Sequence, residues 1–236
     1  MSSDCSKDPE EGESMKEGMD SEEEEDAEDL GEEEEEDDEM DSDEEAEDPS
    51  LKEKIAWVDV ETSGLDVDQD TIMEVAVVVT NSLLNVIAES PNLVLKVEDR
   101  LITNMKQPYQ DQHTKTGLIE RCKKSSLSLK AAEDQLLKFL GDHTEKDKTP
   151  LAGNSVNADK KKFLVKYLPR VMEHLQDRVV DVKSVKELCK SWYPDEFNSA
   201  PIPNESNTQV IERVRESIEE LKYYKATLCN AVNVQL

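Results

Sequence analysis

Two carboxylate side chains near the end of an apolar segment are the first sign of chemistry in this sequence. Asp59 and Glu61 alternate with Val58 and Val60, and a glycine turn follows. Side chains in an extended strand alternate between two faces, so both carboxylates point to the same side. By spacing alone, a solvated strand edge is the commoner explanation. Because the rest of the strand has the pattern of a buried one, and a buried charge needs a partner, we expect the pair to bind a divalent cation.

A third carboxylate lies between a short apolar strand and a helix, in the segment NSVNADKKKFL at residues 154–164. Ligands in α/β folds bind at the carboxyl ends of strands, which makes Asp159 a candidate ligand. Taken alone, Asp159 is better explained as an acid in a first helical turn, where the helix dipole favours it. The lysines at 160–162 are ordinarily a solvated helix face, although beside an anionic substrate they would help to bind phosphate.

The elements that must position these residues alternate between strands and helices. We predict strands within residues 55–59, 71–80, 86–97, 150–153 and 179–182. Leucines and alanines at helical spacing predict helices at 128–140, ended by Gly141, then at 157–167, 184–192 and about 208–225, the last capped by Ser206 or Asn207. Short turns join the first strands into an antiparallel meander. The predicted fold class is therefore α/β, with a mixed β-sheet flanked by helices.

Charge divides the chain into two parts. Residues 1–50 contain 28 of the 57 acidic residues and only two lysines, whereas residues 51–236 are nearly neutral, with a net charge of −3. We expect residues 1–50 to be a disordered acidic tail, because they repel one another and offer almost nothing apolar to bury. A plain solubilising role, a basic protein partner and a phosphate mimic all remain open for this tail. The remaining residues suffice for one domain with a real core.

Several classes of protein are disfavoured by the composition. No stretch of 18 apolar residues is available for a membrane span, and the N-terminus has the features of neither a signal peptide nor a mitochondrial presequence. The four cysteines are far apart and form no CxxC pair, which favours reduced thiols over a zinc site. We therefore expect a cytoplasmic or nuclear protein with no membrane association, and no mitochondrial address is supported.

With these segments in view, the chain resembles the oligoribonucleases, a branch of the DEDD superfamily of 3'-5' exonucleases. The resemblance rests on WVDVETSGLD (57–66), HTKTGL (113–118), PLAGNSVNADKKKFL (150–164), VVDVKSVKELCKSWYP (179–194) and VRESIEELKYY (214–224). It implies an RNase H-like fold for a domain at 51–230, followed by a short extension at 231–236. It also implies a homodimer that cleaves very short RNA to nucleoside monophosphates with Mg or Mn, and makes Asp59, Glu61 and Asp159 catalytic metal ligands.

The chain departs from the family in its third motif. Two divalent cations about 3.5 to 4 Å apart need several carboxylates, and a histidine takes the proton of the attacking water. The resemblance places that histidine at Thr208 and the fourth aspartate at Arg213. We expect Arg213, if it points inward, to pair with the remaining carboxylates and to stand in for a metal ion. If instead it points to solvent, Glu212 is the candidate for a displaced ligand.

The resemblance also implies substrate contacts. Leu65 matches an apolar wedge against a base, His113 and Ser155 match positions that cap the terminal phosphate, and Arg178 matches a basic phosphate contact. The family's inserted tyrosine falls on Asp177. From the residues alone, Leu65 is a core residue, Ser155 a turn residue, and His113 a surface loop histidine, while His143 and His174 fit exposed helix ends.

Two functions of different class follow. The first is a degenerate oligoribonuclease paralogue with reduced or lost catalysis, which acts by binding short RNA, a nucleotide or a protein. The second is an active 3'-5' exoribonuclease with an altered site. Thr208 and Arg213 favour the first, because a lost general base costs about 10² to 10⁴ in rate and an arginine opposes cation binding.

Overall fold

The computed structural model describes residues 52–156, 161–202, 204 and 208–231, although the side chains of residues 228–231 are excluded. The chain divides into two units, and the second, Glu44–Leu236, contains every described residue. The boundary predicted at residue 50 and most of the predicted extension therefore lie outside this description. Among the described residues, no helix is both long enough and apolar enough to cross a bilayer.

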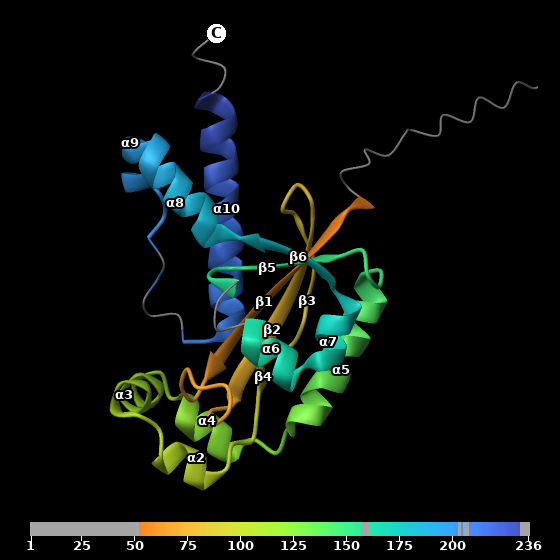
Figure 1. The fold of residues 1–236 in the computed structure, drawn as a ribbon, viewed down its shortest axis with the longest axis vertical. Coiled ribbons are helices and arrows are strands. Elements are labelled where there is room, and N and C mark those ends of the chain that lie inside the picture. The colour runs from red at the N-terminus through yellow and green to blue at the C-terminus, as the bar shows by residue number, and fades with distance from the viewer. Residues whose placement is uncertain (1–51, 157–160, 203, 205–207, 232–236) are drawn as a thin grey trace, which may run out of the picture. The chain divides into compact units, whose positions relative to one another are not determined.

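A mixed sheet forms the centre of the fold (Figure 1). Its main path runs in the order β3-β2-β1-β5-β6, and β4 pairs with β2. The first strands are antiparallel as predicted, whereas β5 is parallel to both β1 and β6. The strands are β1 (Lys54–Thr62), β2 (Ile72–Asn81), β3 (Val86–Glu89), β4 (Leu93–Val94), β5 (Pro150–Gly153) and β6 (Gln176–Asp181).

Helices cover both faces of this sheet (Figure 1), which confirms the predicted α/β class. The described helices are α2 (Asp99–Thr103), α3 (Gln107–Lys115), α4 (Leu118–Lys124), α5 (Leu129–His143), α6 (Lys161–Tyr167), α7 (Pro169–His174), α8 (Val182–Trp192), α9 (Pro194–Asn198) and α10 (Val210–Ala231).

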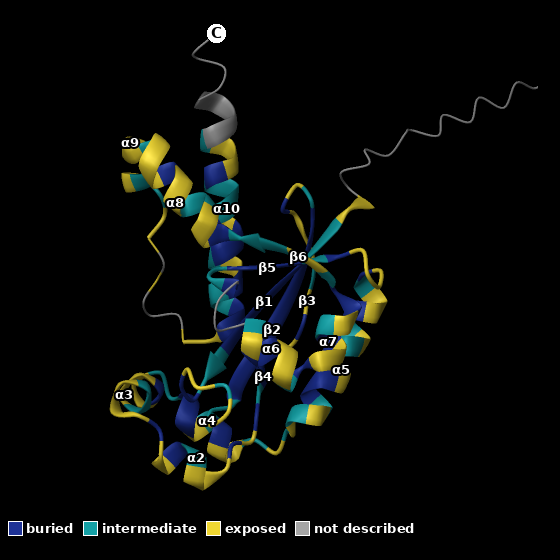
Figure 2. Ribbon diagram, in the orientation of Figure 1, coloured by how far each residue is buried: buried dark blue, intermediate teal, exposed yellow. Residues whose placement is uncertain are grey.

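The strands of the sheet are largely buried (Figure 2), and its two faces bury different sets of apolar side chains. Val58 and Val60 of β1 pack with residues of α5, α6 and α7, whereas Trp57 of the same strand packs with Val214 and Ile218 of α10. The alternation of side chains along β1 therefore supplies both cores at once. It also places Asp59 and Glu61 on the face covered by α10.

One predicted detail of the helices is wrong, one region was left without elements, and the remaining details lie outside the described residues. Gly141 lies inside α5, which continues to His143, because a glycine in right-handed helical geometry does not by itself end a helix. Helices α2, α3 and α4 occupy a region for which no element was predicted. The predicted caps Ser206 and Asn207 lie outside the described residues, as does the predicted first turn at 157–160.

Candidate functional site

The two carboxylates of β1 lie on one side of the strand, as their spacing predicted. Asp59 is 8% exposed, and Glu61 is partly buried next to it. Both lie near the carboxyl end of β1, at the edge of the sheet to which the β5–α6 connection also leads. The strand thus presents two partly desolvated anions that need a positive partner.

That partner is Arg213, in the first turn of α10. Its Nε and Nη2 lie 3.0 Å and 2.9 Å from Oδ2 of Asp59, and its Nη1 lies 2.5 Å from Oε1 of Glu61. The predicted inward pairing is confirmed for these two acids, whereas Asp159 lies outside the described residues. The alternative of Glu212 as a displaced ligand required an outward Arg213, a condition that is not met, and Oε1 of Glu212 lies 2.7 Å from Nη1 of Arg215.

The surroundings of Arg213 hold it in the charged state. Burial by itself lowers the pKa of Arg213, but the charges of Asp59 and Glu61, the hydrogen bond to Asp59 and the charge of Glu74 outweigh burial and raise it. A guanidinium is positive at any physiological pH in any case. The pair of acids is therefore matched by a permanent cation that the chain itself supplies.

This arrangement does not fit two divalent cations. An ion bound by both Asp59 and Glu61 would meet the guanidinium at the position it needs, and like charges repel. Within the described part of the chain, no group of three or more histidine, cysteine, aspartate and glutamate side chains has the arrangement of a metal site. The carboxylates of β1 are thus held as ion-pair partners of α10.

Thr208, at the position where the resemblance implies a histidine, supplies no general base. It is exposed, and its backbone carbonyl accepts a hydrogen bond of 3.1 Å from Nη2 of Arg121. A threonine hydroxyl cannot accept a proton from water near neutral pH as an imidazole does. The backbone of Thr208 is instead held in place by Arg121.

Glu74 of β2 belongs to the same charge cluster and was missed from the sequence. It is fully buried, lies directly opposite Glu61 in the β1–β2 register, and has its Oε2 3.1 Å from Nη2 of Arg121. A signal was present, since Glu74 is the single charged residue in a strand whose other residues from Ile72 to Val79 are apolar. A lone charge in a buried strand needs a partner, which here is Arg121.

Leu65 lies beside the carboxylates on the connection from β1 to β2. It is 61% exposed, so its reading as a core residue is wrong. It lines a cavity of about 220 Å³ together with Tyr109, Phe163, Glu61 and Arg213. The aromatic residues of this cavity come from α3 and α6, and their role was not visible in the sequence because they are distant in the chain.

His113 is a buried residue of α3, so its reading as a surface loop histidine is also wrong. It is 1% exposed, and its Nε2 lies 2.9 Å from the carbonyl oxygen of Thr62, at the end of β1. Ser155 follows β5 and adopts a left-handed backbone, with φ of 62°. Its amide donates to Oδ1 of Asp181, and it lines a second cavity with Asp59 and Arg213. Both residues therefore lie close to the carboxylate pair.

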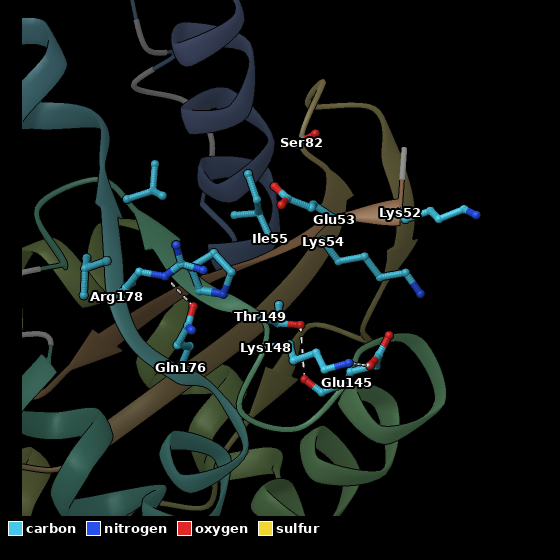
Figure 3. Close-up of a pocket in the computed structure, with 13 residues that line it drawn as sticks. Lys52, Glu53, Lys54, Ile55, Ser82, Glu145, Lys148, Thr149, Gln176 and Arg178 are labelled. Carbon is cyan, nitrogen blue, oxygen red and sulfur yellow. Dashed lines mark hydrogen bonds and ion pairs between the residues drawn. The ribbon is translucent and has the colours of Figure 1, made fainter. Parts of the chain in front are cut away.

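Arg178 is not brought to the other predicted residues. It lines a cavity of about 640 Å³ at the amino ends of β1, β5 and β6, where its Nε donates to Gln176 (Figure 3). The register of the sheet places Arg178 level with Ile55. Glu61 lies six residues further along β1, about 20 Å away at roughly 3.3 Å per residue. Within one chain, Arg178 and the carboxylate pair occupy opposite ends of the sheet.

Comparison with known proteins agrees with this architecture. Residues 56–224 match the exonuclease family of the RNase T type. The mitochondrial oligoribonuclease of Bos taurus is 44% identical over 176 residues, which cover 75% of this chain and 73% of the relative. A probable oligoribonuclease of Dictyostelium discoideum is 41% identical over 177 residues, covering 75% of this chain and 90% of the relative.

Solved structures support the fold alone. A zinc-bound complex of E. coli exonuclease I with single-stranded DNA superposes with a TM-score of 0.60 at 17% identity, over 77% of this chain. The match spans only 42% of that larger protein. The mixed sheet flanked by helices is consistent with an exonuclease fold, and the relatives at 37–44% identity are oligoribonucleases. The chain therefore belongs to the oligoribonuclease family of 3'-5' exoribonucleases.

Proposed function

We propose that this protein is an oligoribonuclease-family member with reduced or lost catalysis, which acts by binding short RNA or nucleotides. One observation carries the proposal: the guanidinium of Arg213 lies on both Asp59 and Glu61, at 2.9 Å and 2.5 Å. A cation of the chain thereby takes the place at which the family activity requires metal. The Mg or Mn dependence implied by the resemblance would then be weakened together with catalysis.

The size of the electrostatic effect supports this proposal. Each pair of unit charges at about 4 Å is worth on the order of 4 kcal/mol at an effective dielectric near 20. Arg213 places one positive charge against the two carboxylates, so a divalent ion approaching them meets both reduced attraction and direct repulsion. Thr208 adds the loss of a general base, which costs about 10² to 10⁴ in rate.

Binding of a short RNA has separate support. The cavity that contains Leu65 opens next to Arg213. The surfaces that it offers to a base are the exposed Leu65 and the partly buried Tyr109, since Phe163 in its wall is 1% exposed and belongs to the core. Stacking of a base on an aromatic or apolar surface is worth about 1 to 3 kcal/mol and does not depend on metal. A site of this kind retains affinity for a base after the hydrolytic machinery is lost.

A homodimer is part of the proposal, because of Arg178. This residue lies at the opposite end of the sheet from Glu61, so it reaches a phosphate at the carboxylate site only if that site belongs to a second copy. Asp177 beside it pairs with Lys161 at 3.1 Å. Sedimentation equilibrium of the full chain, with and without Arg178→Ala, tests the assembly separately from catalysis.

The catalytic proposal is tested with a labelled RNA dinucleotide and Mn²⁺. Four full-length proteins are compared: the natural chain, Thr208→His, Arg213→Asp, and the double variant. We expect the natural chain and Thr208→His to release little or no monophosphate, because Arg213 still blocks the acids. The double variant should be faster than Arg213→Asp by about 10² or more, since it regains a general base.

Asp59→Asn in the natural chain controls for a contaminating nuclease. Monophosphate release by the natural chain that disappears in Asp59→Asn would establish the alternative, an active exoribonuclease with an altered site. If the double variant is inactive while it binds Mn²⁺, the departure at Asp177, where the resemblance implies a tyrosine, becomes the cause of the lost catalysis.

A further inference from the structure

Glu74 is the centre of a polar cluster that reaches beyond the carboxylate site. It is fully buried on β2, and both its carboxylate oxygens have partners. Nη2 of Arg121 lies 3.3 Å and 3.1 Å from the two oxygens, and Nδ2 of Asn92 donates to Oε1. A carboxylate this deep in the sheet is stable only while these partners remain.

Both partners of Glu74 also bind the start of α10. Arg121 donates to the carbonyl of Thr208 at 3.1 Å, and Oδ1 of Asn92 accepts from the amide of Ile211 at 3.1 Å. The first amides of a helix have no acceptor within the helix, so a side chain from elsewhere must satisfy them. Asn92 does this from the β3–β4 connection, 119 residues earlier in the chain.

The guanidinium of Arg121 is only partly satisfied by hydrogen bonds in this cluster. Its Nη1 donates to the carbonyl of Thr116, whereas its Nε is buried and has no hydrogen-bond partner among the residues that the structure describes. Buried nitrogens without partners are rare in folded proteins, because each loses its hydration without replacement. The position of this guanidinium is therefore dictated by Glu74 and by the two carbonyls it binds.

The anchoring matters because Arg213 lies in the first turn of α10. The amide of Arg213 donates to the carbonyl of Gln209 at 3.4 Å, which is a long hydrogen bond for the first turn of a helix. A rotation of one residue, about 100°, would turn the guanidinium away from β1. Contacts that fix Thr208 and Ile211 therefore fix the direction in which Arg213 points.

We infer that Glu74 is a positioning residue for Arg213, acting through Arg121 and Asn92 to hold the start of α10 against the carboxylates of β1. This inference rests on the proposed function, since the position of Arg213 matters there as the block to cation binding. It adds that the block depends on three residues, Glu74, Arg121 and Asn92, none of which lines the cavity that contains Leu65.

The test uses two variants of the full-length protein, called the anchor variants, each of which removes contacts that hold the start of α10. Asn92→Ala removes the contact with Ile211 and leaves Glu74 paired with Arg121. The double variant Glu74→Met and Arg121→Met removes both charges together, which avoids an unpaired buried charge and preserves volume. The matched control is Asp134→Ala with Arg170→Ala, which removes an exposed ion pair between α5 and α7. Arg213→Gln serves as the reference for a fully opened site.

Two readouts separate positioning from general stability. Hydrogen exchange at the amides of Ile211 and Arg213 should speed up by about tenfold or more in both anchor variants, while exchange in β1 stays unchanged. The affinity for Mn²⁺ is measured by electron paramagnetic resonance of the free ion. In both anchor variants it should rise by about tenfold and approach the affinity of Arg213→Gln. The control pair should change neither readout.

The outcomes distinguish the two proposals. If Arg213→Gln gains Mn²⁺ binding but neither anchor variant does, the positioning role of Glu74 is overturned and the block by Arg213 stands. If Arg213→Gln itself gains no binding, the proposed function fails, and hydrogen exchange alone decides the anchor. Should the double variant not fold, as judged by circular dichroism, Asn92→Ala carries the test.

Discussion

Arg213 and Asp59 are 154 residues apart in the sequence, yet Nε and Nη2 of the arginine both point at the same carboxylate oxygen, Oδ2. The third nitrogen of the fork reaches Glu61 at 2.5 Å. One planar group thus bridges two acids on the same face of a strand, which suits the fixed geometry of a guanidinium and would not suit an ammonium. This bridge and the packing of helices α6 and α7 give four predictions.

Replacing Arg213 by Met should destabilise the protein without metal by about 1 to 3 kcal/mol. Asp59 and Glu61 would lose their cation while remaining mostly buried, and the loss is reduced because the pair is not fully removed from water. Urea unfolding at pH 7 measures the change. Addition of Mn²⁺ should restore stability to this variant and not to the natural chain, since a ligand that binds only the folded state stabilises it.

His174 should make stability depend on pH. It is buried, contrary to its predicted exposed position, and its Nε2 lies 2.9 Å from the Thr144 hydroxyl, which donates to the carbonyl of Leu140. Burial, followed by the charge of Lys146, lowers the pKa of His174, with Asp147 opposing. The folded state therefore resists protonation, so this contribution is complete above pH about 6.5 and is lost as pH falls through the lowered folded pKa.

The measurement for His174 is the urea midpoint between pH 5 and pH 7.5. His174→Gln should flatten the curve relative to the natural chain, and the difference in slope should not exceed about 1.4 kcal/mol per pH unit, because one proton is involved. His143→Gln is the control, as this residue packs beside Phe139 at a partly exposed position. Equal slopes for the natural chain and His174→Gln would refute the assignment.

Tyr167→Phe should loosen the connection that carries Leu65. The Tyr167 hydroxyl donates to the carbonyl of Asp70 and lies 3.1 Å from that of Val67, so α6 holds this connection in place. We expect a loss of about 1 kcal/mol in stability and faster hydrogen exchange at the Gln69 and Asp70 amides. Tyr223→Phe, which removes one hydroxyl contact with Glu196, should cost a similar amount and leave those two amides unchanged.

Leu65→Ala should weaken binding of an RNA dinucleotide by about five- to tenfold, which corresponds to about 1 to 1.4 kcal/mol of lost base contact. Stability should change by no more than about 0.5 kcal/mol, because Leu65 is 61% exposed. Leu188→Ala on α8 is the matched control, as it truncates a 45% exposed leucine outside the cavity. Equal affinities for the two variants, measured by fluorescence anisotropy, would place the base elsewhere.

Local sequence patterns were sufficient to predict much of the fold. The alternation around Asp59, the β-branched run of β2 and the apolar segment of β5 were sufficient to predict these strands within three residues of their observed ends. Ser128 was a reliable helix start, since its hydroxyl accepts from the amide of Ala131. These features depend on neighbours in the chain, which a sequence displays directly.

Short elements were the least predictable. Helices α2, α3 and α4 have between five and nine residues, too few for a clear apolar period, and the third predicted strand is divided into β3 and β4. Burial of His113 and His174 was not foreseen either. Each of these histidines is paired with a residue 30 or more positions away, so nothing in its local sequence indicates a partner.

The sequence by itself determined that Asp59 and Glu61 share a face of a strand and that residues 208 and 213 carry Thr and Arg. Only the tertiary structure decided that Arg213 lies on those acids and that Glu74, Arg121 and Asn92 hold the helix that presents it. The physical reason is that side-chain alternation is a property of adjacent residues, whereas an ion pair between a strand and a distant helix depends on how both pack against one sheet.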